Sequence, residues 1–525
     1  MLVISALSGA GTMVLELAAV RLLAPWFGTS LVVWTNVIAV ILLALALGYL
    51  LGGRLATQAA PLRVLSWMLL VAGSLIAWLP YLGSALARTL LPEEIALHEA
   101  AGLIGWGSLA IAVLVFLPPA ALLGTVCPLV VEGLARARQL SAGRAGGMVL
   151  FVSTLGSLVG VFATSHVLLP GLGLQRSFWL VSGTLLAAGV LAMLLARSSR
   201  TMRGGIPCAF LIGISAAGFT PSRPALRAGM VELASRESTY QALRVVEDRT
   251  TDVRLRFLQV NEGFDSFQSV WQAQPGLLPA GFYYNDFLLP LSWDEARATS
   301  WRVLVLGLGA GTVARVFAGE SVGAQLVGVE LDPEVVELGR SFFDLEVAGE
   351  RLSVWSGLDA RVALRIAGGR FEQIVLDCYA NQVEIPHHLC TLEFFRDLRA
   401  RLVEGGWLTA NLAGFDFADP VVSAVASTCA NAFESTVLLV RVPWTRNYML
   451  LARRDGPLPW SGGVLEAATR PSSFALGPRR LPGFTRLVEP VSSLPPLTDD
   501  WCPIENLQLR SLVEARARRL ADGGQ

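Results

Sequence analysis

The chain has 525 residues, of which 53% are hydrophobic and only 16% are charged, a balance too apolar for an ordinary soluble globular protein. Its 41 basic residues equal its 41 acidic ones, so the overall charge gives no indication of a nucleic-acid partner. All the basic residues are Arg, which excludes mechanisms that need a lysine, such as a Schiff base. The six cysteines are widely spaced without a CxxC pair, which argues against a zinc site and favours a reducing compartment.

The first 200 residues contain six apolar runs, each close to the roughly 20 residues that a membrane-spanning helix needs. In the fifth run, the spacing of Gly156 and Gly160 is typical of a helix-packing face. We therefore predict a transmembrane helical domain over residues 1–200, embedded in the lipid bilayer, with spans near 2–24, 31–53, 64–82, 102–124, 148–169 and 177–196.

Arginines in the loops predict the orientation of these spans. The loops after spans two, four and six carry eight arginines, whereas the alternate loops carry two. The eight are Arg54, Arg63, Arg136, Arg138, Arg144, Arg197, Arg200 and Arg203, and the two are Arg88 and Arg176. Because positive residues collect on the cytoplasmic side, we expect a multi-pass protein of the inner (plasma) membrane whose N-terminus and whole second half face the cytoplasm.

A shorter apolar run at 206–219 follows the sixth span. It has only 14 residues and contains Pro207, so an interfacial or buried segment is favoured over a seventh crossing. The seventh crossing stays an alternative, and it would place the second half of the chain on the other side of the membrane.

The pattern changes in the second half of the chain, after a predicted linker at 201–237. Two β-rich segments, 241–247 and 253–260, flank a polar stretch and predict a hairpin within a small β domain over 238–295. Residues 296–525 then alternate apolar strands with helical patterns, which is typical of a doubly wound, Rossmann-like α/β domain. The expected strands are 302–306, 325–329, 352–355, 373–376 and 407–412.

A glycine-rich loop directly follows the first of these strands. Gly307, Gly309 and Gly311 allow a tight turn and a close approach of the backbone to a ligand. Glu330 ends the next strand, 19 residues beyond Gly311, where a carboxylate can accept both hydroxyls of a ribose. The G-x-G-x-G spacing fits an adenosyl sulfonium better than a dinucleotide, and a plain strand-to-helix turn is the alternative.

Two aspartates follow later strands of the same domain. Asp359 is placed to accept a hydrogen bond from an adenine amino group or, equally, to cap a helix. Asp377 closes the fourth strand, where its carboxylate can orient or deprotonate an amine beside a sulfonium carbon, although a turn-capping role is the alternative. Tyr379 either lines the substrate or packs. We expect no metal, because the side chains of the adjacent His387 and His388 point apart in regular structure.

Together these motifs resemble the membrane-fused branch of the spermidine synthase family. In the second half the matching stretches are Ser238–Gln241, Gly307–Gly311, Val329–Asp332, Asp359–Arg361, Asp377, Ile385–Phe394 and Leu497–Asp500. In the first half they are Leu15–Ala24, Gly48–Gly53 and Leu155–Ser157. The resemblance implies an aminopropyltransferase fold, in which a small β domain lies beside a class I methyltransferase-type domain.

The family resemblance also implies an activity and site residues. Decarboxylated S-adenosylmethionine donates an aminopropyl group to a diamine such as putrescine, releasing methylthioadenosine, and such enzymes commonly form homodimers. On this sequence Asp377 is the catalytic residue. The nucleoside is expected to be held by Gln241, Gly307, Gly309, Gly311, Glu330, Asp332 and Asp359, and the amine by Tyr284, Asp286, Tyr379 and Asp500.

The sequence departs from the family where amines are anchored. Ala310 and Ala380 stand where the soluble enzymes have aspartates, and Tyr283–Phe287 replaces a tyrosine-histidine-glutamate run. Asp499, Asp500 or Glu505 are candidates to restore charge from the C-terminal region. Polyamine aminopropyl transfer is therefore favoured, with three alternatives: methyl transfer from intact S-adenosylmethionine, a lyase reaction, and a non-catalytic nucleoside-binding transport or sensor protein.

Overall fold

The computed structural model describes residues 1–27, 31–57, 60–90, 106–196, 226–250, 253–260, 267–293, 300–321, 323–379, 385–466, 477–490 and 495–522. The chain divides into two compact units. The first holds Met1–Ala225 with the short segments Glu237–Ala242 and Asn261–Phe264, and the second holds the remainder. The predicted apolar segment 206–219 lies outside the described residues.

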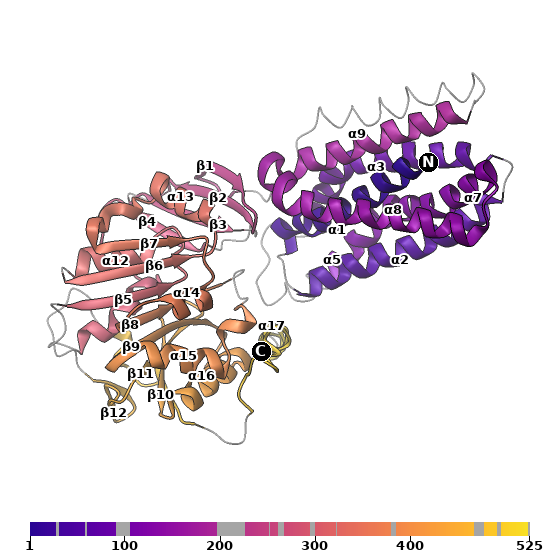
Figure 1. Cartoon of the computed structure of the whole chain (residues 1–525). Helices are drawn as coiled ribbons and strands as arrows, with labels where there is room; N and C mark the ends of the chain where they lie inside the picture. The colour runs from indigo at the N-terminus through magenta and orange to yellow at the C-terminus, as the bar shows by residue number, and fades with distance from the viewer. Residues whose placement is uncertain are drawn as a thin grey trace. The chain divides into compact units, whose positions relative to one another are not determined.

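The first unit is a bundle of apolar helices (Figure 1). Among its described residues, six helices are long and apolar enough to cross a membrane, as the sequence predicts. The fourth crossing is built from consecutive pieces and runs from Ser108 to Arg138, further than the predicted 102–124, whose first residues are not described. The elements are α1 (Leu2–Phe27), α2 (Leu31–Ala56), α3 (Pro61–Leu90), α5 (Ser108–Ile111), η2 (Ala112–Phe116), α6 (Leu117–Gly124), α7 (Val126–Arg138), α8 (Ala142–Ala163), η3 (Thr164–Leu168) and α9 (Leu169–Leu195).

Helices α1 and α8 approach closely along the face that the glycine spacing predicts. A Cβ atom on Gly156 would overlap the carbonyl oxygen of Ala6, and one on Gly160 would lie 2.6 Å from the carbonyl oxygen of Ala10. Small residues at these positions therefore let the two helix backbones come into contact, and such packing substitutes for the hydrophobic driving force that is absent between helices in lipid.

We expect Gly156→Ala to destabilise this unit, because its methyl group has no space against the α1 backbone. The cost should be about 1–3 kcal/mol, the usual range for overpacking, and should lower the thermal unfolding temperature of the detergent-purified protein. Gly147→Ala is the matched control, since it lies in the same helix and an added Cβ there would meet nothing within 4 Å. An unchanged unfolding temperature for Gly156→Ala would contradict the close packing.

The second unit begins with a four-stranded sheet in the order β1-β2-β3-β4. The strands are β1 (Met230–Glu237), β2 (Ala242–Asp248), β3 (Leu255–Val260) and β4 (Ser269–Gln272). The antiparallel pair of β2 and β3 corresponds to the predicted hairpin. Strand β1 lies in the stretch expected to be linker, because its polar sequence gives no clear strand pattern. A 3-10 helix, η5 (Tyr283–Ser292), follows this sheet.

The larger sheet has eight strands in the order β14-β10-β11-β9-β8-β5-β6-β7 (Figure 1). Strands β5 to β9 pair in parallel, and β11 joins β9 in the antiparallel sense. This confirms the Rossmann-like prediction. The strands are β5 (Trp301–Leu306), β6 (Ala324–Glu330), β7 (Leu352–Ser356), β8 (Phe371–Leu376), β9 (Leu402–Ala413), β10 (Val437–Arg441), β11 (Asn447–Arg453) and β14 (Thr485–Val488).

Helices pack on both faces of this sheet, which explains why β5 is apolar at consecutive positions. Leu304 and Leu306 belong to one core cluster, whereas Val303 and Val305 belong to another. The helical elements are α12 (Thr312–Glu320), α13 (Pro333–Phe342), η7 (Leu345–Arg351), α14 (Ala360–Ile366), η8 (His387–Leu389), α15 (Leu392–Arg401), α16 (Pro420–Phe433), η9 (Gly477–Arg480) and α17 (Ile504–Asp522). A short hairpin, β12 (Trp460–Ser461) and β13 (Val464–Leu465), completes the described elements.

The order of the strands fixes where a ligand site is expected. From β5 the chain proceeds outward to β6 and β7, and then returns to place β8 on the other side of β5. In open α/β sheets ligands bind at such a switch point, beyond the carboxyl ends of the strands. The segments after β5 and β8 carry the glycine loop and Asp377.

Candidate active site

The glycine loop leaves β5 in a conformation that needs glycine. Gly307, Gly309 and Gly311 have φ angles of +87°, +56° and +101°, in the left-handed region that disfavours other residues. A Cβ on Gly307 would also collide with the backbone oxygen of Asp377, so this glycine lets the loop pass directly beside the end of β8. The hydroxyl of Ser269 on β4 accepts a hydrogen bond from the Ala310 amide at 2.8 Å and so fixes the loop.

Glu330 ends β6 beside this loop, as predicted. Its carboxylate accepts hydrogen bonds from the amides of Gly309 at 2.8 Å and Asp332 at 3.0 Å. Burial raises the pKa of Glu330, and these amide donors act in the opposite direction. Asp332 itself caps α13 by accepting from the Glu334 amide at 3.1 Å. The structure therefore brings Glu330 to the glycine loop and joins Asp332 to it through the Glu330 carboxylate, while nucleoside binding by either residue stays a prediction.

Asp359 follows β7 and caps α14. One carboxylate oxygen accepts from the amides of Arg361 at 2.9 Å and Val362 at 3.2 Å, so the capping role is present. The other oxygen lies 3.0 Å from Nε2 of His388. Burial acts to raise the pKa of Asp359, but the hydrogen bonds from His388 and Val362 outweigh it and lower that pKa. The predicted contact with adenine stays a prediction.

Asp377 occupies the end of β8, and its side chain is held on both oxygens. The Tyr283 hydroxyl donates to Oδ2 at 3.0 Å, and the Asn411 amide donates to Oδ1 at 3.0 Å. Burial raises the pKa of Asp377 to about 6, although both hydrogen bonds favour the carboxylate and act to lower it. A carboxylate poised near neutral pH can both accept a proton and release it again.

Tyr283 and Asn411 are site residues that the sequence prediction missed. Tyr283 stands next to the predicted Tyr284, and their rings stack with centroids 4.1 Å apart, but it is Tyr283 that reaches Asp377. Asn411 lies in β9 and is fixed in turn by Asn447 of β11, whose amide donates to it at 2.9 Å. The amide of Asn411, near the end of a largely apolar strand, was the available signal.

Tyr379 has its hydroxyl engaged by the neighbouring strand. It donates to the carbonyl oxygen of Asn411 and accepts from the Ala413 amide, both at 2.9 Å. These bonds anchor the segment after Asp377 to β9. A role for Tyr379 in lining the substrate stays a prediction.

Asp286 is fully buried in η5 and pairs with Arg479 of η9. Both carboxylate oxygens accept a hydrogen bond from Arg479: one accepts from Nε, and the other accepts from Nη2 at 2.6 Å. Ala310, where the family has an aspartate, is completely buried in an apolar cluster with residues such as Val335 and Leu338. The carboxylate of Asp286 thus already has a cationic partner within the chain. Ala310 has no carboxylate that could bind an amine.

Two predicted site residues remain, Asp500 and Gln241. Asp500 is exposed, and its neighbour Asp499 forms a bidentate ion pair with Arg361 at 2.7 and 2.6 Å. Gln241 lies in a tight turn closed by Ser238, within the short segment assigned to the first unit. Ala380 lies outside the described residues. Among the described residues no group of three or more His, Cys, Asp or Glu side chains is arranged to hold a metal ion.

The fold and the site define a protein class: a Rossmann-like α/β protein of the methyltransferase and spermidine synthase type, with a glycine loop and a carboxylate at its switch point. No family model matches the sequence. The chain is 30% identical over 460 residues to the polyamine aminopropyltransferase of Mycobacterium tuberculosis, an alignment that covers 82% of this chain and 80% of that protein. The chain belongs to the polyamine aminopropyltransferase family, which confirms the resemblance predicted from its motifs.

Other similar proteins are also named polyamine aminopropyltransferases. Polyamine aminopropyltransferase 1 of Streptomyces coelicolor is 23% identical over 459 residues, covering 85% of this chain and 81% of its own. A probable polyamine aminopropyl transferase of Bifidobacterium longum is 29% identical over 299 residues, 53% of this chain and 62% of that protein. Among solved structures, a probable spermidine synthase from Corynebacterium glutamicum has 24% identity and a TM-score of 0.36, covering 42% of this chain and 79% of that one.

Proposed function

We propose that the protein is a membrane-anchored aminopropyltransferase that uses decarboxylated S-adenosylmethionine to alkylate an amine of the polyamine class. The observation that carries the proposal is the Asp377 carboxylate, held at the switch point between β5 and β8 directly beside the glycine loop. Membership of the polyamine aminopropyltransferase family supports the same activity. In this proposal the nucleoside lies against the glycine loop, Glu330 and Asp332, with Asp359 as a further ligand.

The chemistry assigned to Asp377 is general base catalysis. Its carboxylate accepts a proton from the attacking amine, whose nitrogen forms a bond to the aminopropyl carbon attached to sulfur. The carbon–sulfur bond breaks, and its electron pair neutralises the sulfonium to give methylthioadenosine. Tyr283 and Asn411 position the carboxylate through one hydrogen bond each. Tyr284, Tyr379 and Asp500 are proposed to line the amine site.

A second candidate, methyl transfer or elimination from intact S-adenosylmethionine, is favoured by one specific observation. At two positions where the family anchors amines, this chain has a buried alanine, Ala310, and a carboxylate already paired with arginine, Asp286. The described part of the site therefore offers a dicationic amine less negative charge than the family pattern does.

One experiment separates the two candidates. The detergent-purified protein is titrated calorimetrically with S-adenosylmethionine, its decarboxylated form and methylthioadenosine, and the products are identified by mass spectrometry with putrescine present. Preference for the decarboxylated donor with formation of spermidine supports aminopropyl transfer. Preference for intact S-adenosylmethionine without spermidine would overturn it in favour of methyl transfer or a lyase reaction. Ligand binding with no product from any donor would instead support a sensor.

We also propose that the N-terminus and the second unit face the cytoplasm. Arginines near the ends of the described helices, such as Arg54 in α2, Arg136 in α7 and Arg144 in α8, support this orientation through the positive-inside rule. Fusion of a reporter that is active only in the cytoplasm, and of one active only outside it, to the C-terminus provides the test. Activity of the outside reporter would contradict the proposal.

The raised pKa of Asp377 predicts a pH dependence of turnover. Since the carboxylate is the active form, kcat/KM should fall as the pH drops through about 6 and Asp377 becomes protonated. Tyr283→Phe removes a hydrogen bond that favours the carboxylate, so the midpoint should move to higher pH. Comparing the two pH profiles cancels the titration of the amine substrate, which is the same for both enzymes. Identical midpoints would contradict the assignment of the midpoint to Asp377.

A further inference from the structure

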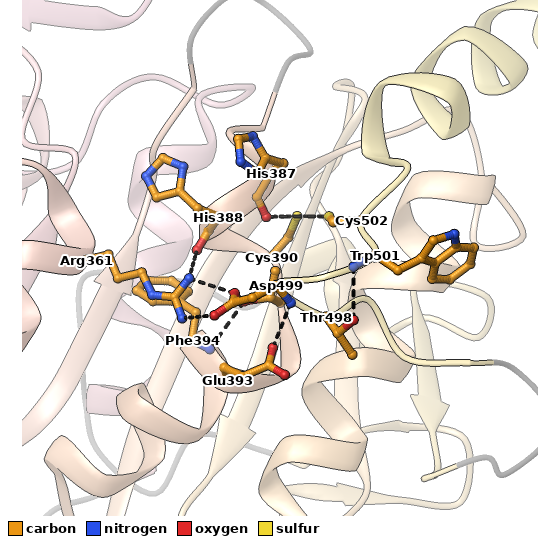
Figure 2. A network of polar contacts seen from close by, with 11 residues as sticks. Arg361, His387, His388, Cys390, Glu393, Phe394, Thr498, Asp499, Trp501 and Cys502 are labelled. Carbon is orange, nitrogen blue, oxygen red and sulfur yellow. Dashed lines mark hydrogen bonds and ion pairs between the residues drawn. The ribbon is translucent and has the colours of Figure 1, made fainter.

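Two thiols come together in the second unit, although they lie 112 positions apart in the sequence. The sulfur atoms of Cys390 and Cys502 are separated by 3.5 Å. Both also lie close to the carbonyl oxygen of His387, at 3.2 Å from Cys390 and 3.4 Å from Cys502 (Figure 2). Cys390 directly follows η8, and Cys502 precedes α17, so the pair joins a turn of the α/β core to the C-terminal segment.

Other contacts hold these two segments in register. Arg361 donates to both carboxylate oxygens of Asp499 at 2.7 and 2.6 Å, and the Thr391 hydroxyl donates to the same carboxylate at 2.7 Å (Figure 2 shows the ion pair). The Leu392 amide donates to the Leu497 carbonyl oxygen at 2.7 Å. The two thiols are therefore held close together, because several hydrogen bonds and an ion pair join the segments that carry them.

The two thiols differ in environment in the way that a reactive pair requires. Cys390 is completely buried, and both its hydrogen bond with Cys502 and its burial raise the pKa of Cys390. Cys502 is only partly buried, and the same hydrogen bond lowers the pKa of Cys502. The accessible sulfur is thus the one with more thiolate character, which is the form that reacts with oxidants.

We propose that Cys390 and Cys502 form a redox site at which hydrogen peroxide produces an intrachain disulfide. The Cys502 thiolate attacks one peroxide oxygen, the O–O bond breaks, and the departing oxygen leaves as water, giving a sulfenic acid. The Cys390 sulfur then attacks the Cys502 sulfur, the S–O bond breaks, and the second oxygen leaves as water with the remaining proton. Two thiols are oxidised by two electrons, and one peroxide is reduced to two waters.

Disulfide formation requires only a small movement of the two sulfur atoms. The sulfurs must approach from 3.5 Å to a bonded distance of about 2.05 Å, and both belong to segment ends rather than to the interior of a helix or strand. The bond would make the link between the C-terminal segment and the core covalent, in addition to the Arg361–Asp499 ion pair. In a reducing compartment the thiols are the resting form, and reductant reverses the reaction. Formation of this disulfide does not require that the proposed catalytic function is correct.

The test treats the full-length, detergent-purified protein with hydrogen peroxide, then counts thiols in denaturant and maps tryptic peptides by mass spectrometry. The expected result is a loss of two thiols per chain and a cross-link between peptides 371–396 and 487–510, both lost again on reduction. Peptide 371–396 also contains Cys378, so a Cys378→Ser variant must retain the cross-link, whereas Cys390→Ser and Cys502→Ser must abolish it. A cross-link to another cysteine, or sulfinic acid at Cys502 without any cross-link, would overturn the proposal.

Discussion

Replacing Asp377 by Asn is expected to lower kcat about 1,000-fold, within the usual range for loss of a general base. The amide has nearly the same size as the carboxylate but cannot accept the amine proton. Asn411 can still donate to the side-chain oxygen, and the new amide group can donate to the Tyr283 hydroxyl, so the local packing should survive. Methylthioadenosine binding, measured by calorimetry, should change by less than about tenfold, because the nucleoside ligands proposed here lie on other segments.

Asp455→Asn is the matched control for this variant. Asp455 lies in a turn after β11, pairs with Arg399 and Arg454 at the surface, and is remote in the sequence from every proposed site residue. Its turnover should equal that of the wild type. Retention of more than a tenth of kcat by Asp377→Asn would show that this carboxylate is not the base, and loss of methylthioadenosine binding would mean that the variant disturbs the site as a whole.

The backbone of the site could be predicted because local sequence determines it. The continuous apolar pattern of β5 requires burial on both faces, and the glycines after it have positive φ angles that few other residues adopt. Asp377 follows from the same logic, since the end of a parallel strand at the switch point must face the ligand side. These features depend on short stretches of chain and on the alternation of strands with helices.

The side-chain partners could not be predicted in the same way. Asp286 and Arg479 are 193 positions apart, and nothing in either local sequence indicates that they pair. Asn411 approaches Asp377 only because β8 and β9 lie side by side in the sheet. For Asp359 the sequence predicted helix capping and adenine binding equally. The structure shows the cap, which does not exclude adenine binding.

Breaking the buried pair of Asp286 and Arg479 is expected to have the largest effect on stability. Arg479→Met leaves a fully buried carboxylate without its cation, and Asp286→Leu leaves the guanidinium without its anion. Each single variant should lose about 3–5 kcal/mol of the free energy of unfolding. The double variant should lose much less than the sum, because no unpaired charge remains. Thermal and denaturant unfolding of the purified protein provide the measurement.

Arg236→Met is the matched control, since its ion pair with Glu334 is about half exposed and should contribute less than about 1 kcal/mol. The double-variant cycle also decides the role of Asp286. If its carboxylate served mainly to bind the amine, Asp286→Asn would raise the KM for the amine while the unfolding temperature stayed unchanged. A large loss of stability that Arg479→Met relieves would instead mean that this carboxylate neutralises Arg479 inside the protein. Binding an amine there would require it to displace a bidentate guanidinium, so charge for the substrate would have to come from Asp377 and other residues.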